Sequence, residues 1–349
     1  MTKARNLSLL STVEAGATAD QTKADLNAIG VSGGRKNLII NGGFDVWQRG
    51  TTLSTEGYCA DRWTYGTSGG AGVHSRQQHT AADMDTFGQQ YFHRLAVSSG
   101  NNNQGMSTLL EDVTRFAGKT LTLSFYAKGT NPAFGSMDTV VGTYMGSGGS
   151  GASEYYATGA ITLTASWQRF TVQITVASLV GKTLGTGSYL YVYPARQTVA
   201  DTGTAAWQMD IANVQLELGS VATDFEHRSY GEELALCQRY FEKRDYVSGA
   251  IVAMGHAQTS SIVSAALDYS PKRIVPTITL PYHASSSGST IAFLTAGGSW
   301  PSTFGSLTVA SASKNNCRIQ QSSGGSYSSG NASWLHAGGS PSITIDAEL

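Results

Sequence analysis

From Arg35 onward, apolar and polar residues alternate in short stretches, which is the period-two pattern of strands that are buried on one face. Runs rich in Gly and Ser, which favour turns, separate these stretches. This spacing, with almost no helical period, predicts an antiparallel β-sandwich over residues 35–227. The clearest predicted strands span residues 121–125, 161–164, 170–176, 190–192 and 211–218.

The same alternation returns over residues 246–349, again with turn-forming clusters of Ser and Gly. A segment of about 100 residues with this pattern is long enough for a small sandwich of six or seven strands. We therefore predict a second, smaller β-sandwich domain at the C-terminal end of the chain. Its predicted strands span residues 250–254, 260–267, 277–280, 290–294, 306–310, 316–320 and 343–347.

One segment between the two β regions has a clear helical period. Ser229 and Glu232 form a capping box, in which each side chain can bond to the backbone N–H of the other residue. Apolar residues then recur at helical spacing, which predicts a helix over residues 230–243 inside a linking segment, residues 228–245. The apolar positions are Tyr230, Leu234, Cys237 and Phe241.

Residues 1–34 differ in character from the rest, being rich in Ala, Ser and Thr. A short helical stretch over 19–29 ends at Gly30, but it has too few apolar residues to fold alone. Two interpretations stay open: a disordered leader, or a docking segment that becomes ordered against a partner chain. If it docks, its apolar residues would make the contact: Leu9, Leu10, Val13, Leu26 and Ile29.

The composition then excludes several classes of protein. Lys and Arg total 23, Asp and Glu total 24, and only 13% of the residues are charged, where about 25% is usual. Without a cationic surplus, a nucleic-acid partner is not expected. No apolar run approaches the roughly 20 residues of a membrane span, so membrane insertion is not expected either.

Sequence motifs of enzyme chemistry are missing. There is no phosphate-binding GxxxxGK[ST] loop and no HExxH zinc motif. Cys59, Cys237 and Cys317 are odd in number and far apart, which favours reduced, packed thiols over a disulfide. We expect a protein that is not an enzyme and carries no cofactor.

The most informative polar pattern is a row of tyrosines at Tyr189, Tyr191 and Tyr193. Alternate residues of a strand face the same side, so if Leu190 and Val192 face the core, the three tyrosines share the outer face. Tyrosine combines a flat apolar ring with a polar hydroxyl. The row could bind sugar rings, pack in a subunit interface or line the rim of the core.

Several blocks of the sequence resemble bacteriophage tail fibre and receptor-binding proteins. Residues 37–50 read NLIINGGFDVWQRG and residues 58–63 read YCADRW. Further similar blocks are 214–226, 228–230, 233–240 and the terminal DAEL of 346–349. In that family the first block opens a jelly-roll similar to carbohydrate-binding modules. The resemblance implies the same jelly-roll for residues 35–227.

The resemblance also implies a virion component, made in the host cytoplasm and placed in the phage tail. Such a protein is usually a homotrimer, and Tyr230, Leu234, Cys237 and Phe241 would then lie in its interface. Its N-terminus would attach to a tail, baseplate or adaptor protein, and its C-terminal part would meet a host-surface glycan. Related modules often hold a structural Ca²⁺, for which Asp45 and Asp210 are in matching positions.

Two other functions fit the same pattern of residues. One is a head fibre or another protein that decorates the virion. The other belongs to a different class, a tailspike enzyme that degrades polysaccharide.

Overall fold

The computed structural model describes residues 35–65, 72–98, 105–129, 137–151, 154–197, 206–281, 290–294, 307–322 and 327–349. The chain forms two compact units. Unit 1 comprises the residues up to Gly43, Ser54–Glu56 and Tyr65–His227. Unit 2 comprises Phe44–Leu53, Gly57–Thr64 and Arg228–Leu349. Residues 44–53 and 57–64, which we predicted in the first domain, therefore fold with the C-terminal region.

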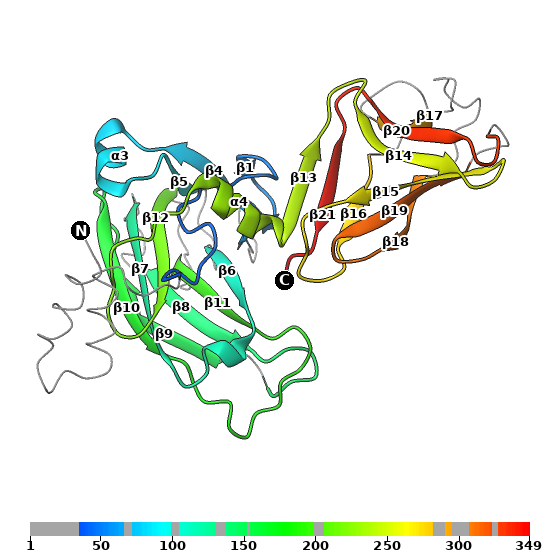
Figure 1. Ribbon diagram of the computed structural model, residues 1–349. Helices are drawn as coiled ribbons and strands as arrows, with labels where there is room; N and C mark the ends of the chain where they lie inside the picture. Colours follow the sequence, from blue (N-terminus) through cyan, green and yellow to red (C-terminus); the bar gives the residue numbers. More distant parts are fainter. Residues whose placement is uncertain are drawn as a thin grey trace, which may run out of the picture. The chain divides into compact units, whose positions relative to one another are not determined.

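Unit 1 is a two-layered antiparallel sandwich (Figure 1). Its first sheet has the order β4 (Gly72–Gln78), β5 (Tyr91–Val97), β12 (Trp207–Leu218), β7 (Thr120–Gly129) and β10 (Gln168–Thr175). Its second sheet has the order β6 (Met106–Glu111), β11 (Tyr189–Arg196), β8 (Met137–Tyr144) and β9 (Glu154–Ile161). Because the chain repeatedly crosses from one sheet to the other, the predicted jelly-roll sandwich is confirmed.

Strand β10 shows how the alternating pattern builds the core of unit 1. Phe170 and Val172 lie opposite Phe125 and Leu123 of β7, and the rings of Phe125 and Phe170 stack with centroids 5.5 Å apart. The residues between them in β10 face solvent. Burial of one face per strand is the physical source of the period of two.

Shorter elements complete the two units. They are the short strands β1 (Thr52–Leu53), β2 (Gly57–Tyr58) and β3 (Trp63–Tyr65) and the 3₁₀ helix η1 (Val113–Arg115). Helix α3 (Ala81–Phe87) was not predicted; Thr80 caps its start by accepting a hydrogen bond from the N–H of Asp83. Among the described residues, neither α-helix is long and apolar enough to span a membrane.

Residues 38–40 are an apolar run that predicts a short buried strand, but the structure assigns them to none. The segment instead lies beside β12, where the N–H of Leu38 bonds to the carbonyl of Leu216 and Val214 bonds to that of Gly42. A Cβ at Gly42 would lie 2.1 Å from the carbonyl oxygen of Val214, so only glycine fits this close approach.

Unit 2 is also a sandwich, as predicted for the smaller β domain. One sheet has the order β13 (Phe241–Asp245), β21 (Ser342–Asp346) and β16 (Thr277–Thr279). The other has the order β17 (Thr290–Leu294), β20 (Ala332–Gly338), β14 (Ile251–Ala257), β15 (Ile262–Asp268), β19 (Asn316–Ser322) and β18 (Leu307–Ala312). Apolar side chains from both sheets form one core, including Val263, Phe293, Ile319, Leu335, Ile343 and Ile345.

The predicted helix 230–243 is too long at its C-terminal end. Helix α4 spans Tyr230–Gln238 and starts at the predicted cap, Ser229, which accepts a hydrogen bond from the N–H of Glu232. Phe241 instead begins β13 and lies opposite Asp346 of β21. Pairing with a strand from the end of the chain therefore overrides the helical spacing that includes Phe241.

Candidate functional site

The tyrosine row lies on β11 as predicted from the alternating pattern. Leu190 and Val192 are fully buried between the sheets of unit 1. Tyr189, Tyr191 and Tyr193 therefore point to the opposite, outer face of the second sheet. Tyr189 and Tyr193 are partly exposed, whereas Tyr191 is buried to 6% exposure.

A fourth tyrosine, Tyr144 of β8, joins the row because it lies directly opposite Tyr189. The two rings are 4.9 Å apart between centroids, and the rings of Tyr191 and Tyr193 meet edge to face at 6.1 Å. We call Tyr144, Tyr189, Tyr191 and Tyr193 the tyrosine face. Sequence reasoning missed Tyr144 because β8 was not recognised as a strand.

Gly142 of β8 makes room for the ring of Tyr191, which lies opposite it on β11. A Cβ at Gly142 would lie 2.1 Å from the hydroxyl oxygen of Tyr191, so the ring lies across the glycine. Tyr191 is thus more deeply buried than Tyr189 and Tyr193, its partly exposed neighbours in the row. The missing side chain at Gly142 is the feature that allows this shape.

The tyrosine face has polar groups at its edges. Glu111 of β6 lies opposite Tyr189, and the guanidinium carbon of Arg196 lies 5.0 Å from the ring centroid of Tyr193. Burial, followed by the proximity of Tyr144 and Tyr193, raises the pKa of Tyr189, so its hydroxyl stays protonated at neutral pH. The face therefore offers flat rings, phenol hydroxyls and two flanking charged residues.

The predicted calcium ligands belong to different units, Asp45 to unit 2 and Asp210 to unit 1. Both carboxylate oxygens of Asp210 accept hydrogen bonds from Arg94, from Nε at 2.7 Å and from Nη2 at 2.8 Å. Burial, and then the charge of Glu233, raise the pKa of Asp45 to about 6. Because Arg94 already neutralises Asp210, this carboxylate does not fit the role of a Ca²⁺ ligand.

The four predicted interface residues have different surroundings in the single chain. Tyr230 is 60% exposed and Leu234 is partly buried. Cys237 and Phe241 are buried at 0% and 4% exposure inside unit 2. A contact with another chain, as expected for a trimer, would thus use Tyr230 and Leu234 directly. The predicted docking residues of 1–34 lie outside the described residues.

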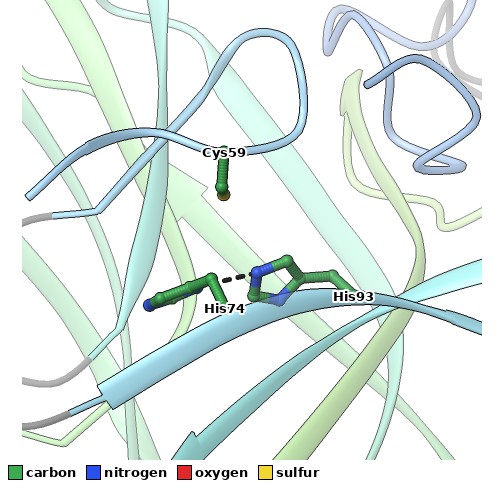
Figure 2. A group of neighbouring side chains, drawn as sticks. All are labelled: Cys59, His74 and His93. Atoms are coloured by element: carbon green, nitrogen blue, oxygen red, sulfur yellow. Dashed lines mark hydrogen bonds between the residues drawn. The ribbon is translucent and has the colours of Figure 1, made fainter. Parts of the chain in front are cut away.

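A pair of histidines is buried between the sheets of unit 1. Nδ1 of His74, on β4, lies 2.7 Å from Nε2 of His93, on β5, as the dashed line in Figure 2 shows. Burial lowers the pKa of His74 to about 3, and burial with the neighbouring His74 lowers the pKa of His93. Both imidazoles are neutral at pH 7, so one donates the shared hydrogen bond. Cys59, also labelled in Figure 2, belongs to unit 2.

Unit 2 brings together charged residues from three of the sequence blocks that resemble tail fibre proteins. Arg62, 2% exposed, forms an ion pair with Glu348, and its guanidinium lies 3.5 Å from the ring centroid of Tyr240. Arg49 lies between Glu348 and Asp61, at 3.3 Å and 3.6 Å. We call Arg49, Asp61, Arg62 and Glu348 the ionic cluster. It joins Arg49, Asp61 and Arg62 to the segment that follows β21 in unit 2.

The residues of the ionic cluster have a role in packing. The two arginines are held by the aromatic rings of Phe241 and Tyr240, each 3.5 Å from a guanidinium carbon. The N–H of Gln48 donates to Asp61 at 2.7 Å. Because these charges are paired and covered, the cluster offers no open surface to a ligand.

No family model matches the chain, and no curated protein sequence matches it either. Solved structures similar to it include carbohydrate-binding jelly-roll modules. The CBM22-2 xylan-binding domain of Paenibacillus barcinonensis Xyn10C is 18% identical, with a TM-score of 0.32, and the match covers 48% of this chain and 98% of that one. The N-terminal cellulose-binding domain of Cellulomonas fimi β-1,4-glucanase C is 19% identical, with a TM-score of 0.27, and the match covers 51% and 95%.

A third similar structure is the enzymatically active domain of tailspike protein 4 from bacteriophage CBA120. It is 14% identical, with a TM-score of 0.34, and the match covers 52% of this chain and 21% of that one. At these identities and TM-scores, none of the three places the chain in a family.

Proposed function

We propose that this chain is a non-enzymatic adhesion protein that binds a cell-surface glycan on its tyrosine face. The observation that carries the proposal is the row of Tyr189, Tyr191 and Tyr193, joined by Tyr144, on the outer face of one sheet. Aromatic rings on a rigid sheet contact the apolar faces of sugar rings, and tyrosine hydroxyls can bond to sugar hydroxyls.

The shape of the face supports this choice over simple packing. The partly exposed rings of Tyr189 and Tyr193 lie beside the deeper Tyr191, which rests on Gly142. Glu111 and Arg196 stand at the margins, where they can accept and donate hydrogen bonds. Flat rings with polar groups at the edges are suited to a pyranose ring, which is apolar on its faces and polar around its rim.

The wider role that we propose is that of a phage tail fibre, acting as a homotrimer with its N-terminus on the particle. Support comes from the resemblance of residues 37–50, 58–63 and 346–349 to that family, and charged residues of these blocks pack together in unit 2. Three copies of a weak glycan site would gain avidity through symmetry.

Glycan binding is tested by titrating the full chain against a panel of neutral host-surface oligosaccharides. We expect Tyr189→Ala and Tyr193→Ala each to weaken binding by about tenfold to a hundredfold, from the loss of a stacked ring and its buried area. The matched control is Tyr91→Ala, a partly buried tyrosine on the other sheet of unit 1, which should bind normally. Unchanged binding in both test variants would overturn the proposal.

The trimer is tested by light scattering of the full chain. Three chains of 36.7 kDa give a mass of about 110 kDa, and a single mass near that of one chain at micromolar concentration would exclude the trimer. The competing enzyme function is tested with purified protein and host polysaccharide. A fall in polymer length over time would show that the protein degrades the polysaccharide, and the non-enzymatic proposal would then be wrong.

A further inference from the structure

The outer face of the other sheet of unit 1 carries three charged residues in a row across adjacent strands. Arg94 of β5 lies opposite Asp210 of β12, and Asp210 lies opposite Lys128 of β7. Residues directly opposite one another in a sheet share a face, so the order of charges across the strands is positive, negative, positive. Leu95, Met209 and Ala127, next to them in sequence, are fully buried on the core side.

The negative charge in the middle is paired most closely with one of its two neighbours, and the amide nitrogen of Gln208 also donates to it, at 3.3 Å from Oδ1 of Asp210. Asp210, whose side chain is 1% exposed, accepts hydrogen bonds at 2.7 Å and 2.8 Å from Arg94, a bidentate pair. The ammonium of Lys128 stays 3.9 Å from the nearer oxygen of Asp210, beyond hydrogen-bond distance. Together the three groups carry one net positive charge.

Lys128 is held in place by aromatic rings. Its ammonium lies 4.6 Å from the ring centroid of Trp167 and 5.6 Å from that of Phe92. Trp167 is fixed in turn by Phe92, Phe87 and His79, with ring centroids 5.3 to 5.4 Å away. Among the described residues, this ammonium donates no hydrogen bond, although it has three protons to offer.

Arg94, Lys128 and Asp210 line a pocket of about 180 Å³. Its wall also includes Gln208, together with Gly129, which has no side chain, and Ala165, whose methyl group is small, so space is left beside the charges. The volume is below the roughly 300–1,000 Å³ of pockets for drug-sized ligands, so it suits one ring-sized group.

We propose that this pocket binds the carboxylate of an acidic sugar residue, a hexuronate. Lys128 would donate charge-assisted hydrogen bonds to the carboxylate, and the amide of Gln208 would contact a ring hydroxyl. The single surplus positive charge matches the single negative charge of the ligand, and Asp210 disfavours a second anion. The pocket lies on a different sheet from the tyrosine face. Unit 1 would therefore bind acidic sugars on one face and neutral sugars on the other.

The probe is sodium glucuronate, titrated into the full chain by calorimetry at low ionic strength, with glucose as the matched neutral ligand. We expect glucuronate to bind and glucose to bind at least tenfold more weakly at this pocket. We expect Lys128→Met to weaken glucuronate binding about tenfold or more, because a hydrogen bond to a charged group is lost. Binding should also weaken as salt is added.

Two further variants serve as a control for the loss of a lysine and as an independent test of the pocket. Lys119→Met removes an exposed lysine just before β7, nine positions from Lys128 and about 30 Å along the strand, and should bind glucuronate normally. Ala165→Trp fills the pocket from an exposed loop and should abolish binding without touching the charges. Glucuronate binding that survives in both Lys128→Met and Ala165→Trp would overturn the proposal, as would binding lost in Tyr193→Ala alone.

Discussion

The two units differ in the polar pairs whose two partners are both buried: in unit 1 the buried carboxylate of Asp210 pairs with a partly exposed Arg94, whereas unit 2 buries both members of two of its ion pairs. Unit 1 encloses His74 and His93, which share a hydrogen bond and have pKa values lowered by burial, so they are neutral. Unit 2 encloses ions, among them Arg62 with Glu348 and, at 2.6 Å, Lys272 with Glu242. A neutral pair tolerates a low-dielectric core by itself, whereas each buried ion depends on its partner.

This difference concerns the location of the few charged residues of the chain. Only 13% of the residues are charged, and several of these pack inside unit 2 instead of covering its surface. The tyrosine face of unit 1 in turn uses uncharged rings at a surface. Removing a partner should therefore cost much more in unit 2 than changing a polar group costs in unit 1.

The largest expected effect is that of Arg62→Met in the ionic cluster. The variant leaves the carboxylate of Glu348, 5% exposed, without its closest cation, and we expect a loss of about 3–5 kcal/mol in the free energy of unfolding. Chemical denaturation measures it. The control is Lys243→Met, which removes an exposed ion pair with Asp245 and should cost less than about 1 kcal/mol. Equal losses in the free energy of unfolding for the two variants would show that burial does not make the ion pair of Arg62 more important.

A smaller effect is expected from Gly142→Ala beneath the tyrosine face. The added methyl group would collide with the ring of Tyr191, and overpacking of this kind costs about 1–3 kcal/mol. The displaced ring should also weaken glycan binding. Gly231→Ala in helix α4, where the new methyl group meets open space, should instead be neutral or stabilise by less than about 1 kcal/mol. Chemical denaturation and glycan titration of both variants measure the two effects. Equal results for Gly142→Ala and Gly231→Ala would show that the space around the glycine does not matter.

The smallest net effect concerns pH, because the two units respond with opposite signs. The pKa of His74 is about 3, below its unfolded value of 6.5, so its contribution to stability is full above pH 6.5 and falls by about 2 kcal/mol between pH 7 and 5. Burial raises the pKa of Asp61 to about 6, above its unfolded value of 3.8, so unit 2 gains about 1 kcal/mol over the same range. The pKa of Glu242 is lowered from 4.5, so its loss begins only at more acidic pH.

Two variants separate these contributions in thermal unfolding at pH 7 and pH 5. His74→Phe should reduce the acid destabilisation, and Asp61→Asn should reduce the acid stabilisation, to which Asp45, with a pKa also raised to about 6, still contributes. If both variants shift the pH dependence in the same direction, the assignment of opposite signs to the two units is wrong.

Local patterns were enough to predict the β class and the direction of the tyrosine row. Leu190 and Val192 alternate with Tyr189, Tyr191 and Tyr193, and a strand's geometry forces these two sets onto opposite faces. The cap of α4 at Ser229 was equally local, since its bond to the N–H of Glu232 spans one turn. Where the helix ends depends on a distant residue, because Phe241 pairs with Asp346, and there the prediction was wrong.

What the sequence determined by itself is thus what neighbouring residues decide: strand alternation, the turn signals and the start of α4. Only the tertiary structure decided that Phe241 lies opposite Asp346 in a strand pair and that Tyr144 belongs to the tyrosine face. It also decided the ion pairs of Glu348 with Arg62 and of Asp210 with Arg94. Each of these contacts joins residues far apart in the chain, and their energies depend on burial and strand register, which no local pattern encodes.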